Sequence, residues 1–228
     1  MPRKTQTSVD RRELAHLAAA VTARARATAL SAVALEGLAA YLELLARWNV
    51  AFNLVGPDDW RNIFTSLVTD SIYLADFLRC LPLPDNPQMW DLGAGAGLPG
   101  IPLRLVWTQG EYYMVERREK RAIFLSTVLA HLSLKNTHVF RGSAESFFES
   151  RKTPHGRTDG IVSRAFLPWR DLLDLAQPHL NSRGTLIIFA SEDPPEELPA
   201  PWTLTDACTY YVVADKKRCF WALSPSRD

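Results

Sequence analysis

One stretch of the sequence, residues 90–100, constrains the fold more than any other. It contains an acid, Asp91, followed by glycines at the alternate positions Gly93, Gly95 and Gly97. Alternate glycines permit a tight turn and let the backbone approach a ligand where a Cβ atom would clash. An apolar helical pattern follows, and we expect its free N–H groups and its positive dipole end to face the same point. The stretch therefore predicts a site for a nucleoside that carries an anionic group.

The spacing of the glycines limits which nucleoside this is. A dinucleotide fingerprint has glycine or alanine at the sixth place, where this chain has Leu98, and the Gly-Lys-Ser/Thr ending of a P-loop is missing. An acid two residues before the first glycine instead resembles motif I of the class I S-adenosylmethionine-dependent methyltransferases. In that family the acid steadies the loop, and the methionine end of the cofactor lies over the glycines. The alternative is a glycine-rich turn without a ligand.

A second acid supports the ligand interpretation. Residues 111–116 read as a strand that ends in Glu116, about 20 residues beyond the glycine loop. Folds of this kind place there the carboxylate that accepts hydrogen bonds from the ribose hydroxyls. A carboxylate suits a ribose diol because two acceptor oxygens face two O–H donors. Alone, Glu116 would read as a solvated acid at a strand end; after the glycine loop, the ribose contact is the better prediction.

Composition sets the outer limits. At 228 residues the chain has room for one sizeable core, or for one core and a small helical segment. No apolar run is long enough to span a bilayer, and no signal peptide follows the basic start. Three widely spaced cysteines indicate buried thiols in a reducing compartment, and the five histidines lack metal-ligand spacing. We therefore expect a metal-free, cytoplasmic protein that does not enter a membrane.

The net charge of +1 conceals an uneven distribution. Residues 1–28 hold six basic side chains against two acids, and residues 117–152 hold eight against three. Between residues 171 and 206 the balance reverses, with seven acids against Arg183. Basic clusters beside a cofactor site suit a polyanionic substrate such as RNA. The other interpretation is that these helices are simply solvated surfaces.

The chain divides at a breaker-rich linker over residues 82–87. Helical spacing of apolar residues over 35–51 and 62–79 predicts a helical segment at 1–84, with about the first 10–25 residues open to disorder. Residues 85–228 alternate between strands and helices, which predicts an α/β fold with a Rossmann-like, doubly wound parallel sheet. We expect strands at 89–92, 112–115, 137–141, 160–163, 185–190, 207–213 and 218–223, and helices at 102–107, 120–132, 143–149 and 168–180. The last two strands, joined by residues 214–217, read as the antiparallel closing hairpin that is typical of class I methyltransferases.

Taken together, these residues resemble the small-subunit rRNA methyltransferase G family (RsmG, also called GidB) from about Leu38 onward. Four motifs in order carry the resemblance: Trp48-Asn49-x-x-Phe52-Asn53-Leu54 with Asp70-Ser71, the loop from Asp91 to Leu103 with its Leu-Pro-Gly-Ile-Pro extension, Lys120-Arg121-x-x-Phe124-Leu125, and Ser163-Arg164-Ala165-Phe166. The resemblance implies S-adenosylmethionine as cofactor and methyl transfer to N(7) of a guanosine in 16S rRNA of the small ribosomal subunit. We expect the chain to act as a monomer.

The predicted cofactor-binding residues have two sources. The glycine pattern and the second strand indicate the loop and Glu116, whereas the resemblance adds contacts from Leu98, from the backbone of Ala144 and Glu145 to the adenine, and from Arg164. The full set is Asp91, Gly93, Gly95, Gly97, Leu98, Glu116, Ala144, Glu145 and Arg164. For Arg164, a phosphate, the cofactor and an internal carboxylate are all open partners, and we favour the cofactor because the residue ends a strand.

No catalytic residue is predicted, because guanine N(7) has a free lone pair at neutral pH and needs no general base. Positioning of that atom against the methyl donor can contribute on the order of 7–11 kcal/mol. After the fourth strand the chain lacks both the Asp/Asn-Pro-Pro-Tyr/Phe motif of exocyclic-amine enzymes and the Pro-Cys nucleophile of pyrimidine-C5 enzymes. Trp169 stands nearby, and it either stacks on a flipped base or packs under the following helix.

Three positions depart from the family pattern. Leu67 stands where the family usually has His, Ser143 where it has Arg, and Ala190-Ser191 where it has Lys-Gly. Without these polar groups, the sequence does not predict which side chains contact the guanosine. Two alternatives therefore remain: a methyltransferase of the same fold with another RNA, a protein or a small molecule as acceptor, and a non-catalytic module that binds cofactor or RNA.

Overall fold

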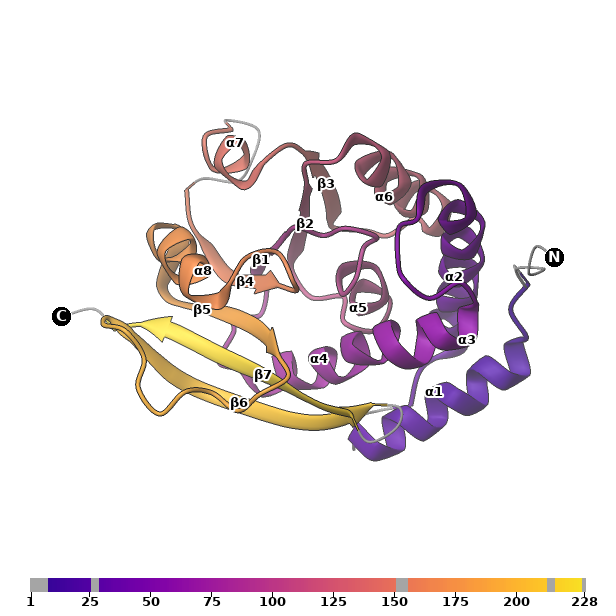
Figure 1. Cartoon of the computed structure of the whole chain (residues 1–228), viewed down its shortest axis with the longest axis horizontal. Helices are drawn as coiled ribbons and strands as arrows, with labels where there is room; N and C mark the ends of the chain where they lie inside the picture. Colours follow the sequence, from indigo (N-terminus) through magenta and orange to yellow (C-terminus); the bar gives the residue numbers. More distant parts are fainter. Residues whose placement is uncertain (1–7, 26–28, 151–155, 213–215, 227–228) are drawn as a thin grey trace.

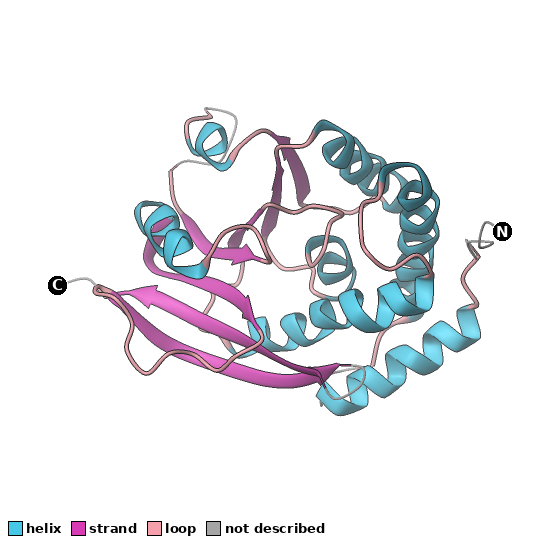
Figure 2. Cartoon of the chain, viewed as in Figure 1, coloured by secondary structure: helices cyan, strands magenta, loops and turns pink. Residues whose placement is uncertain are grey.

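A seven-stranded sheet organises the residues that this computed structural model describes, which are 8–25, 29–150, 156–212 and 216–226. Helices cover both faces of the sheet (Figures 1 and 2). The strands are β1 (Gln88–Leu92), β2 (Glu111–Glu116), β3 (Thr137–Arg141), β4 (Thr158–Ser163), β5 (Leu180–Ala190), β6 (Trp202–Val212) and β7 (Lys216–Pro225). Their spatial order is β3-β2-β1-β4-β5-β7-β6, and the first five in this order are parallel, which confirms the predicted α/β fold.

The predicted antiparallel closing hairpin is also confirmed, but its last strand lies inside the sheet. β7 pairs antiparallel with both β5 and β6, so β6 forms the edge. Phe220 and Trp221 point to opposite faces of the sheet and both are buried, as expected for an interior strand. Lys216 and Lys217, expected in the connecting turn, instead begin β7, and residues 214 and 215 lie outside the described residues.

The helices before the linker follow the apolar periodicity, with one interruption. The helices and turns of the chain are α1 (Arg11–Ala25), α2 (Ala32–Phe52), α3 (Trp60–Ile63), the π-helical turn η1 (Phe64–Val68), α4 (Thr69–Cys80), α5 (Gly100–Val106), α6 (Glu119–Leu132), α7 (Ala144–Phe148), α8 (Trp169–Ala176) and the 3₁₀ turn η2 (Gln177–His179). α2 begins where the Ser31 hydroxyl accepts a hydrogen bond from the Ala34 N–H at 3.1 Å, and it ends at Asn53 in the left-handed conformation. The single helix expected over 62–79 is divided by η1, where the Thr69 hydroxyl donates to the Phe64 carbonyl at 2.9 Å.

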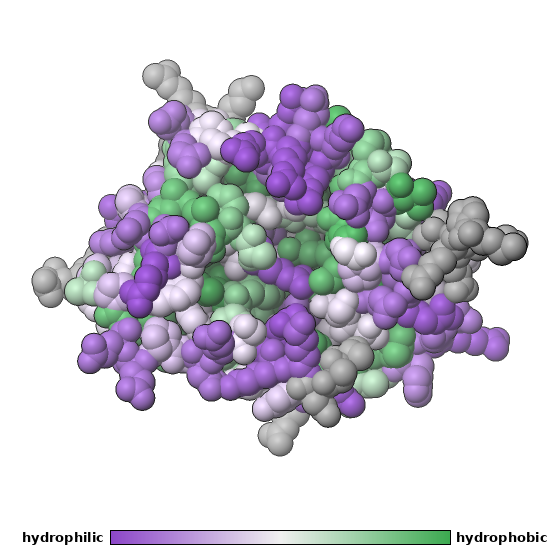
Figure 3. Space-filling model, viewed as in Figure 1, coloured by the Kyte–Doolittle hydropathy of each residue, from purple (hydrophilic) through white to green (hydrophobic). Residues whose placement is uncertain are grey.

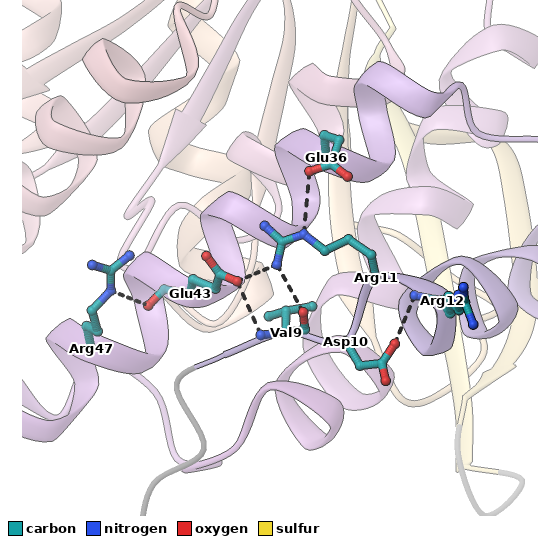
Figure 4. Close-up of polar contacts among 7 residues, drawn as sticks. All are labelled: Val9, Asp10, Arg11, Arg12, Glu36, Glu43 and Arg47. Carbon is teal, nitrogen blue, oxygen red and sulfur yellow. Dashed lines mark hydrogen bonds and ion pairs between the residues drawn. The ribbon is translucent and has the colours of Figure 1, made fainter.

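Helix α1 lies in the N-terminal segment for which the sequence allowed disorder. Asp10 caps its first turn, because one carboxylate oxygen accepts from the N–H groups of Arg12 and Glu13 at 2.9 and 3.1 Å. Glu43 of α2 then holds the start of the helix by an ion pair with Arg11 and by accepting from the Val9 N–H at 3.2 Å (Figure 4). These specific partners order a segment whose apolar stripe alone is weak.

Two hydrophobic clusters lie on opposite faces of the sheet. On β1, Met89 belongs to the first cluster and Trp90 to the second, because successive side chains of a strand point to opposite faces. The first cluster includes buried residues of α1, α2, α4, α5 and α6, and the second includes those of α7 and α8. The helices before the linker therefore share a core with the sheet, and the division of the chain at residue 84 stays a prediction.

Within the ranges given above, we find no helix with the length and apolar character needed to cross a membrane. The same described residues contain no group of three or more His, Cys, Asp or Glu side chains arranged to hold a metal ion.

Candidate functional site

The glycine loop connects β1 to α5 at the carboxyl ends of the parallel strands. Gly93, Gly95 and Gly97 have φ angles of 74°, 60° and 81°, in the left-handed region that favours glycine. A Cβ atom on Gly93 would lie 2.6 Å from the ring of Phe166, and one on Gly97 would lie 2.3 Å from Ile101. Backbone conformation therefore favours glycine at all three positions, and space requires it at Gly93 and Gly97.

Asp91 supports this loop from beneath. Its side chain is buried, and it accepts hydrogen bonds from the Tyr112 hydroxyl at 3.2 Å and from the backbone N–H of Gly100. Desolvation raises the pKa of Asp91 to about 7, although both hydrogen bonds oppose the rise. The first N–H of α5 thus serves an internal acid, where the sequence analysis expected it to face a ligand. A direct contact between Asp91 and the cofactor stays a prediction.

Glu116 ends β2 and fastens the loop from the other side. One carboxylate oxygen accepts from the Gly95 N–H at 2.8 Å, and the other accepts from the Arg118 N–H at 2.7 Å. Each oxygen of a carboxylate has a second lone pair, so both can still accept from a ribose hydroxyl. Glu116 is therefore held in a fixed orientation before it meets a ligand.

A pocket of about 360 Å³, here called the nucleoside pocket, opens beside the loop. Its lining combines Gly93, the end of β2, the turn before α7 and the loop after β4. It brings together Gly93, Glu116, Ala144 and Glu145 of the predicted set; its other lining residues are Val115, Arg117, Arg118, Arg121, Gly142, Ser143, Ala165, Phe166 and Leu167. Its volume lies in the range of about 300–1,000 Å³ that small-molecule sites occupy.

Two predicted residues lie behind the loop. Gly97 and Leu98 are buried, and neither is among the described residues that line the nucleoside pocket. The loop is braced there by α2, because the Tyr41 hydroxyl donates to the Ala96 carbonyl at 2.9 Å. The expected cofactor contact of Leu98 stays a prediction, whereas its packing role is evident.

The structure adds lining residues that the sequence analysis did not select. The Phe166 ring lies against Gly93, and Arg121 lies 3.5 Å from the position of a Cβ atom on Gly95. Both residues belong to motifs that resemble the family, but nothing in the sequence shows that either side chain points toward the glycine loop. Ser143 caps α7 by accepting from the Ser146 N–H at 3.2 Å, and its hydrogen bond to the exposed Glu145 carboxylate lowers the pKa of that acid.

Arg164 has internal partners in the structure. Its guanidinium forms an ion pair with Asp70 at 2.8 Å and donates to the Leu67 carbonyl at 3.2 Å. Asp70 is buried, and its other oxygen accepts from the Tyr210 hydroxyl at 2.9 Å. An internal carboxylate is therefore one partner of Arg164, and the residue connects β4 to α4 and β6; its contact with the cofactor stays a prediction.

A basic surface adjoins the nucleoside pocket. Arg117, Arg118 and Lys120 are exposed at the start of α6, and the first two line the pocket. The Lys120 ammonium lies 5.1 Å from the centre of the Phe52 ring at the end of α2. Figure 3 shows hydrophilic side chains gathered over the part of the molecule where Figure 1 places β3 and α6. This combination of cations and an aromatic ring suits a phosphate-containing chain with unstacked bases.

The pocket fits a nucleoside. Glu116 presents two fixed acceptors, the turn before α7 presents backbone groups, and Gly93 lines the pocket without a side chain. Among its described lining residues no Gly-Lys pair is available for a triphosphate. The geometry agrees with the carboxylate–diol contact expected from the sequence.

Comparison with known proteins identifies the family. Residues 34–214 match the family model described as rRNA small subunit methyltransferase G. A protein named ribosomal RNA small subunit methyltransferase G from Nitratidesulfovibrio vulgaris is 52% identical over 192 residues, which is 84% of this chain and 85% of the relative. Relatives of the same name from Oleidesulfovibrio alaskensis and Lawsonia intracellularis are 43% and 44% identical, covering 87% and 85% of this chain and 89% and 88% of their own lengths.

Solved structures agree on the fold. TrmN from Thermus thermophilus matches with a TM-score of 0.51 at 17% identity, covering 68% of this chain and 48% of its own. TYW2 from M. jannaschii in complex with AdoMet matches with a TM-score of 0.50 at 15% identity, covering 69% and 75%. The fold is thus that of the class I methyltransferases. The chain belongs to the rRNA small subunit methyltransferase G family, and it is a methyltransferase whose methyl donor is S-adenosylmethionine.

Proposed function

We propose that this chain transfers a methyl group to N(7) of a guanosine in the 16S rRNA of the small ribosomal subunit. The observation that carries the proposal is the match to relatives that are named for the small-subunit rRNA. The match covers most of the length of these relatives. The basic surface beside the nucleoside pocket supports an RNA substrate. The proposed substrate resides in the cytoplasm, so we assign the chain to the cytoplasm, and we expect it to act as a monomer.

Within the pocket, each residue has a defined task. Glu116 would accept from the ribose hydroxyls, the backbone at Ala144 and Glu145 would contact the adenine, and Gly93 would leave space for the methionine end. S-adenosylmethionine supplies an electrophilic methyl group on a sulfonium when it is bound. Arg164, engaged by Asp70, would act by holding the β4 end in place.

Guanine N(7) attacks through its free lone pair. The new N–C bond forms as the S–C bond breaks, and the electron pair of that bond stays on sulfur, so no proton moves and no general base is required. The contribution of the protein is then alignment, which can supply on the order of 7–11 kcal/mol. This chemistry agrees with a pocket that shows oriented backbone and one fixed carboxylate near the ligand.

The test is methyl transfer to small ribosomal subunits from cells that lack the native enzyme. With labelled S-adenosylmethionine, we expect 7-methylguanosine at a single site, identified by mass spectrometry of the digested RNA, and no label with the Gly93→Val variant. Transfer to a different nucleoside or to a protein would replace the proposed acceptor. Cofactor binding by calorimetry without transfer to any ribosomal component would favour the non-catalytic alternative.

A further inference from the structure

A second cavity adjoins the nucleoside pocket, and the proposed function gives it no task. It has a volume of about 370 Å³ and lies at the carboxyl ends of β4 and β5. Ala165 and Leu167, in the loop after β4, line both cavities. A group in the second cavity therefore lies directly across this shared wall from a ligand in the nucleoside pocket.

Two indole rings form the apolar side of this second cavity. Trp169 at the start of α8 and Trp221 of β7 both line it, with ring centres 5.8 Å apart and planes at 80°. Trp221 is buried and fixed, because its Nε1 donates to the Glu192 carbonyl at 3.1 Å. Trp169 is half-buried, and the Arg170 guanidinium lies 4.4 Å from its ring centre. The Trp169 ring lines the cavity, and the face of an indole can stack with a planar or cationic group.

The polar side of the cavity carries one charge. Glu192 follows β5, is exposed, and is the one charged side chain among the described residues that line the cavity. Ser191 beside it adds a hydroxyl. A carboxylate and an indole that line the same cavity suit a planar ligand with two adjacent N–H donors on one edge.

We propose that this second cavity binds the target guanine, with its ring stacked on Trp169 and its N1–H and N2–H groups donated to the Glu192 carboxylate. This inference rests on the proposed function. The N1–N2 edge of guanine lies opposite N(7), so a base held at Glu192 directs N(7) toward Ala165 and Leu167 and hence toward the methyl donor. Adenine presents an acceptor at N1, which a carboxylate repels, so the same contact discriminates between the purines.

The charge of the product supports the same assignment. Methylation at N(7) gives guanine a positive charge, and both the face of an indole ring and a nearby carboxylate stabilise a cation. The stabilisation grows as the N–C bond forms, so it favours the transition state over the neutral base. Glu192 and Trp169 therefore set both specificity for guanine and part of the rate.

The first experiment measures binding of 7-methylguanosine 5′-monophosphate to the full chain by equilibrium dialysis. We expect Glu192→Gln to weaken binding roughly tenfold to a hundredfold, Trp169→Ala to weaken it by a similar factor, and Trp169→Phe to restore most of the affinity. Glu196→Gln is the matched control, because Glu196 is an exposed acid of the same loop outside the cavity lining. Adenosine monophosphate should compete poorly with the wild-type protein.

The second experiment measures methyl transfer to small subunits together with cofactor affinity by calorimetry. Glu192→Gln should lower kcat/KM for transfer at least roughly tenfold while the cofactor affinity stays unchanged, since Glu192 lies outside the nucleoside pocket. Undetectable nucleotide binding by the wild-type protein, or equal binding by all variants, overturns the inference even if transfer is observed. Binding that depends on Glu192 and Trp169, without transfer to ribosomal RNA, keeps the guanine cavity and rejects the proposed function.

Discussion

Two regions of the molecule are each built around a buried aspartate, and the partners of the two acids differ. In the glycine loop, Asp91 has neutral partners, the Tyr112 hydroxyl and a backbone N–H. At the junction of α4, β4 and β6, Asp70 has the Arg164 guanidinium at 2.8 Å in addition to a tyrosine hydroxyl. Each aspartate is 1% exposed, so burial alone does not distinguish them.

The difference in partners determines the charge of each acid. Desolvation raises the pKa of Asp91 to about 7, because hydrogen bonds from neutral groups only partly stabilise the carboxylate. Desolvation also raises the pKa of Asp70, but the Arg164 cation opposes the rise. The glycine loop therefore rests on an acid that titrates near neutral pH, whereas the junction rests on an ion pair. Two equally buried acids thus differ in whether a cation or only neutral hydrogen-bond donors oppose the effect of desolvation on the pKa.

The largest expected effect comes from removing the cation. Arg164→Ala leaves the Asp70 carboxylate buried without its charged partner, which should lower the free energy of unfolding by about 3–5 kcal/mol. Urea denaturation at pH 7 measures this loss of unfolding free energy. Adding Asp70→Asn to Arg164→Ala should recover part of the loss, because the unpaired charge disappears. A single variant within about 0.5 kcal/mol of the wild type would remove the contrast between the two regions.

Gly93→Val acts on the glycine loop without changing any charge. The substitution puts a β-branched residue at a φ of 74° and a Cβ atom 2.6 Å from Phe166, so the floor of the nucleoside pocket must move. We expect S-adenosylmethionine affinity to fall by at least roughly 100-fold, or about 2.7 kcal/mol, by calorimetry. Gly56→Val is the control, since no atom lies within 4 Å of a Cβ atom at Gly56. Unchanged affinity in Gly93→Val would reject the loop as the cofactor site.

The pH dependence of Asp91 sharpens the comparison directly. The folded protein holds this proton with a pKa of about 7, and the unfolded chain holds it with a pKa near the ordinary value of 3.8. Below pH 7 the folded state therefore binds the proton more tightly, and stability falls as the pH rises from 5 to 8. Relative to Asp91→Asn, the wild type should lose roughly 2–3 kcal/mol of unfolding free energy over this interval. If the unfolding free energies of the two proteins change equally between pH 5 and 8, Asp91 stays ionised throughout.

The smallest effects distinguish the two tyrosines. Tyr210 donates to the acid that is paired with Arg164, whereas Tyr112 donates to an acid that is mostly protonated at pH 6. Removal of the hydroxyl should therefore cost about 1.5–3 kcal/mol in Tyr210→Phe and about 0.5–1.5 kcal/mol in Tyr112→Phe. The measurement is thermal or urea unfolding of both variants in one buffer. A larger loss of unfolding free energy in Tyr112→Phe than in Tyr210→Phe would contradict this assignment of partners.

Most of the fold was accessible from local patterns. The five parallel strands, the helices between them and the closing hairpin follow from apolar periodicity and turn residues. The order of the last two strands across the sheet did not follow from periodicity, because β7 reads as apolar on both faces and nothing local shows which strand it joins. The π-helical turn was also missed, since one extra residue per turn leaves the apolar spacing almost unchanged.

The candidate site divides in the same way. Gly93 and Glu116 lie within a continuous stretch of chain, so their spacing predicts the pocket that they form. The partner of Arg164 could not be read from spacing, because Asp70 lies on a helix before the linker and Tyr210 lies 140 residues further along the chain. A contact of that kind depends on how the elements pack, which a local pattern does not contain.

The position of β7 has a consequence for how the protein is made. β6 joins the sheet only through β7, which lies between β5 and β6, so β6 cannot join the sheet until β7 has been made. During synthesis the growing chain therefore carries two open strand edges until residues 216–225 have left the ribosome. A premature stop before this strand would remove two strands from the sheet and leave an aggregation-prone edge on β5, so completion of the sheet depends on residues 216–225.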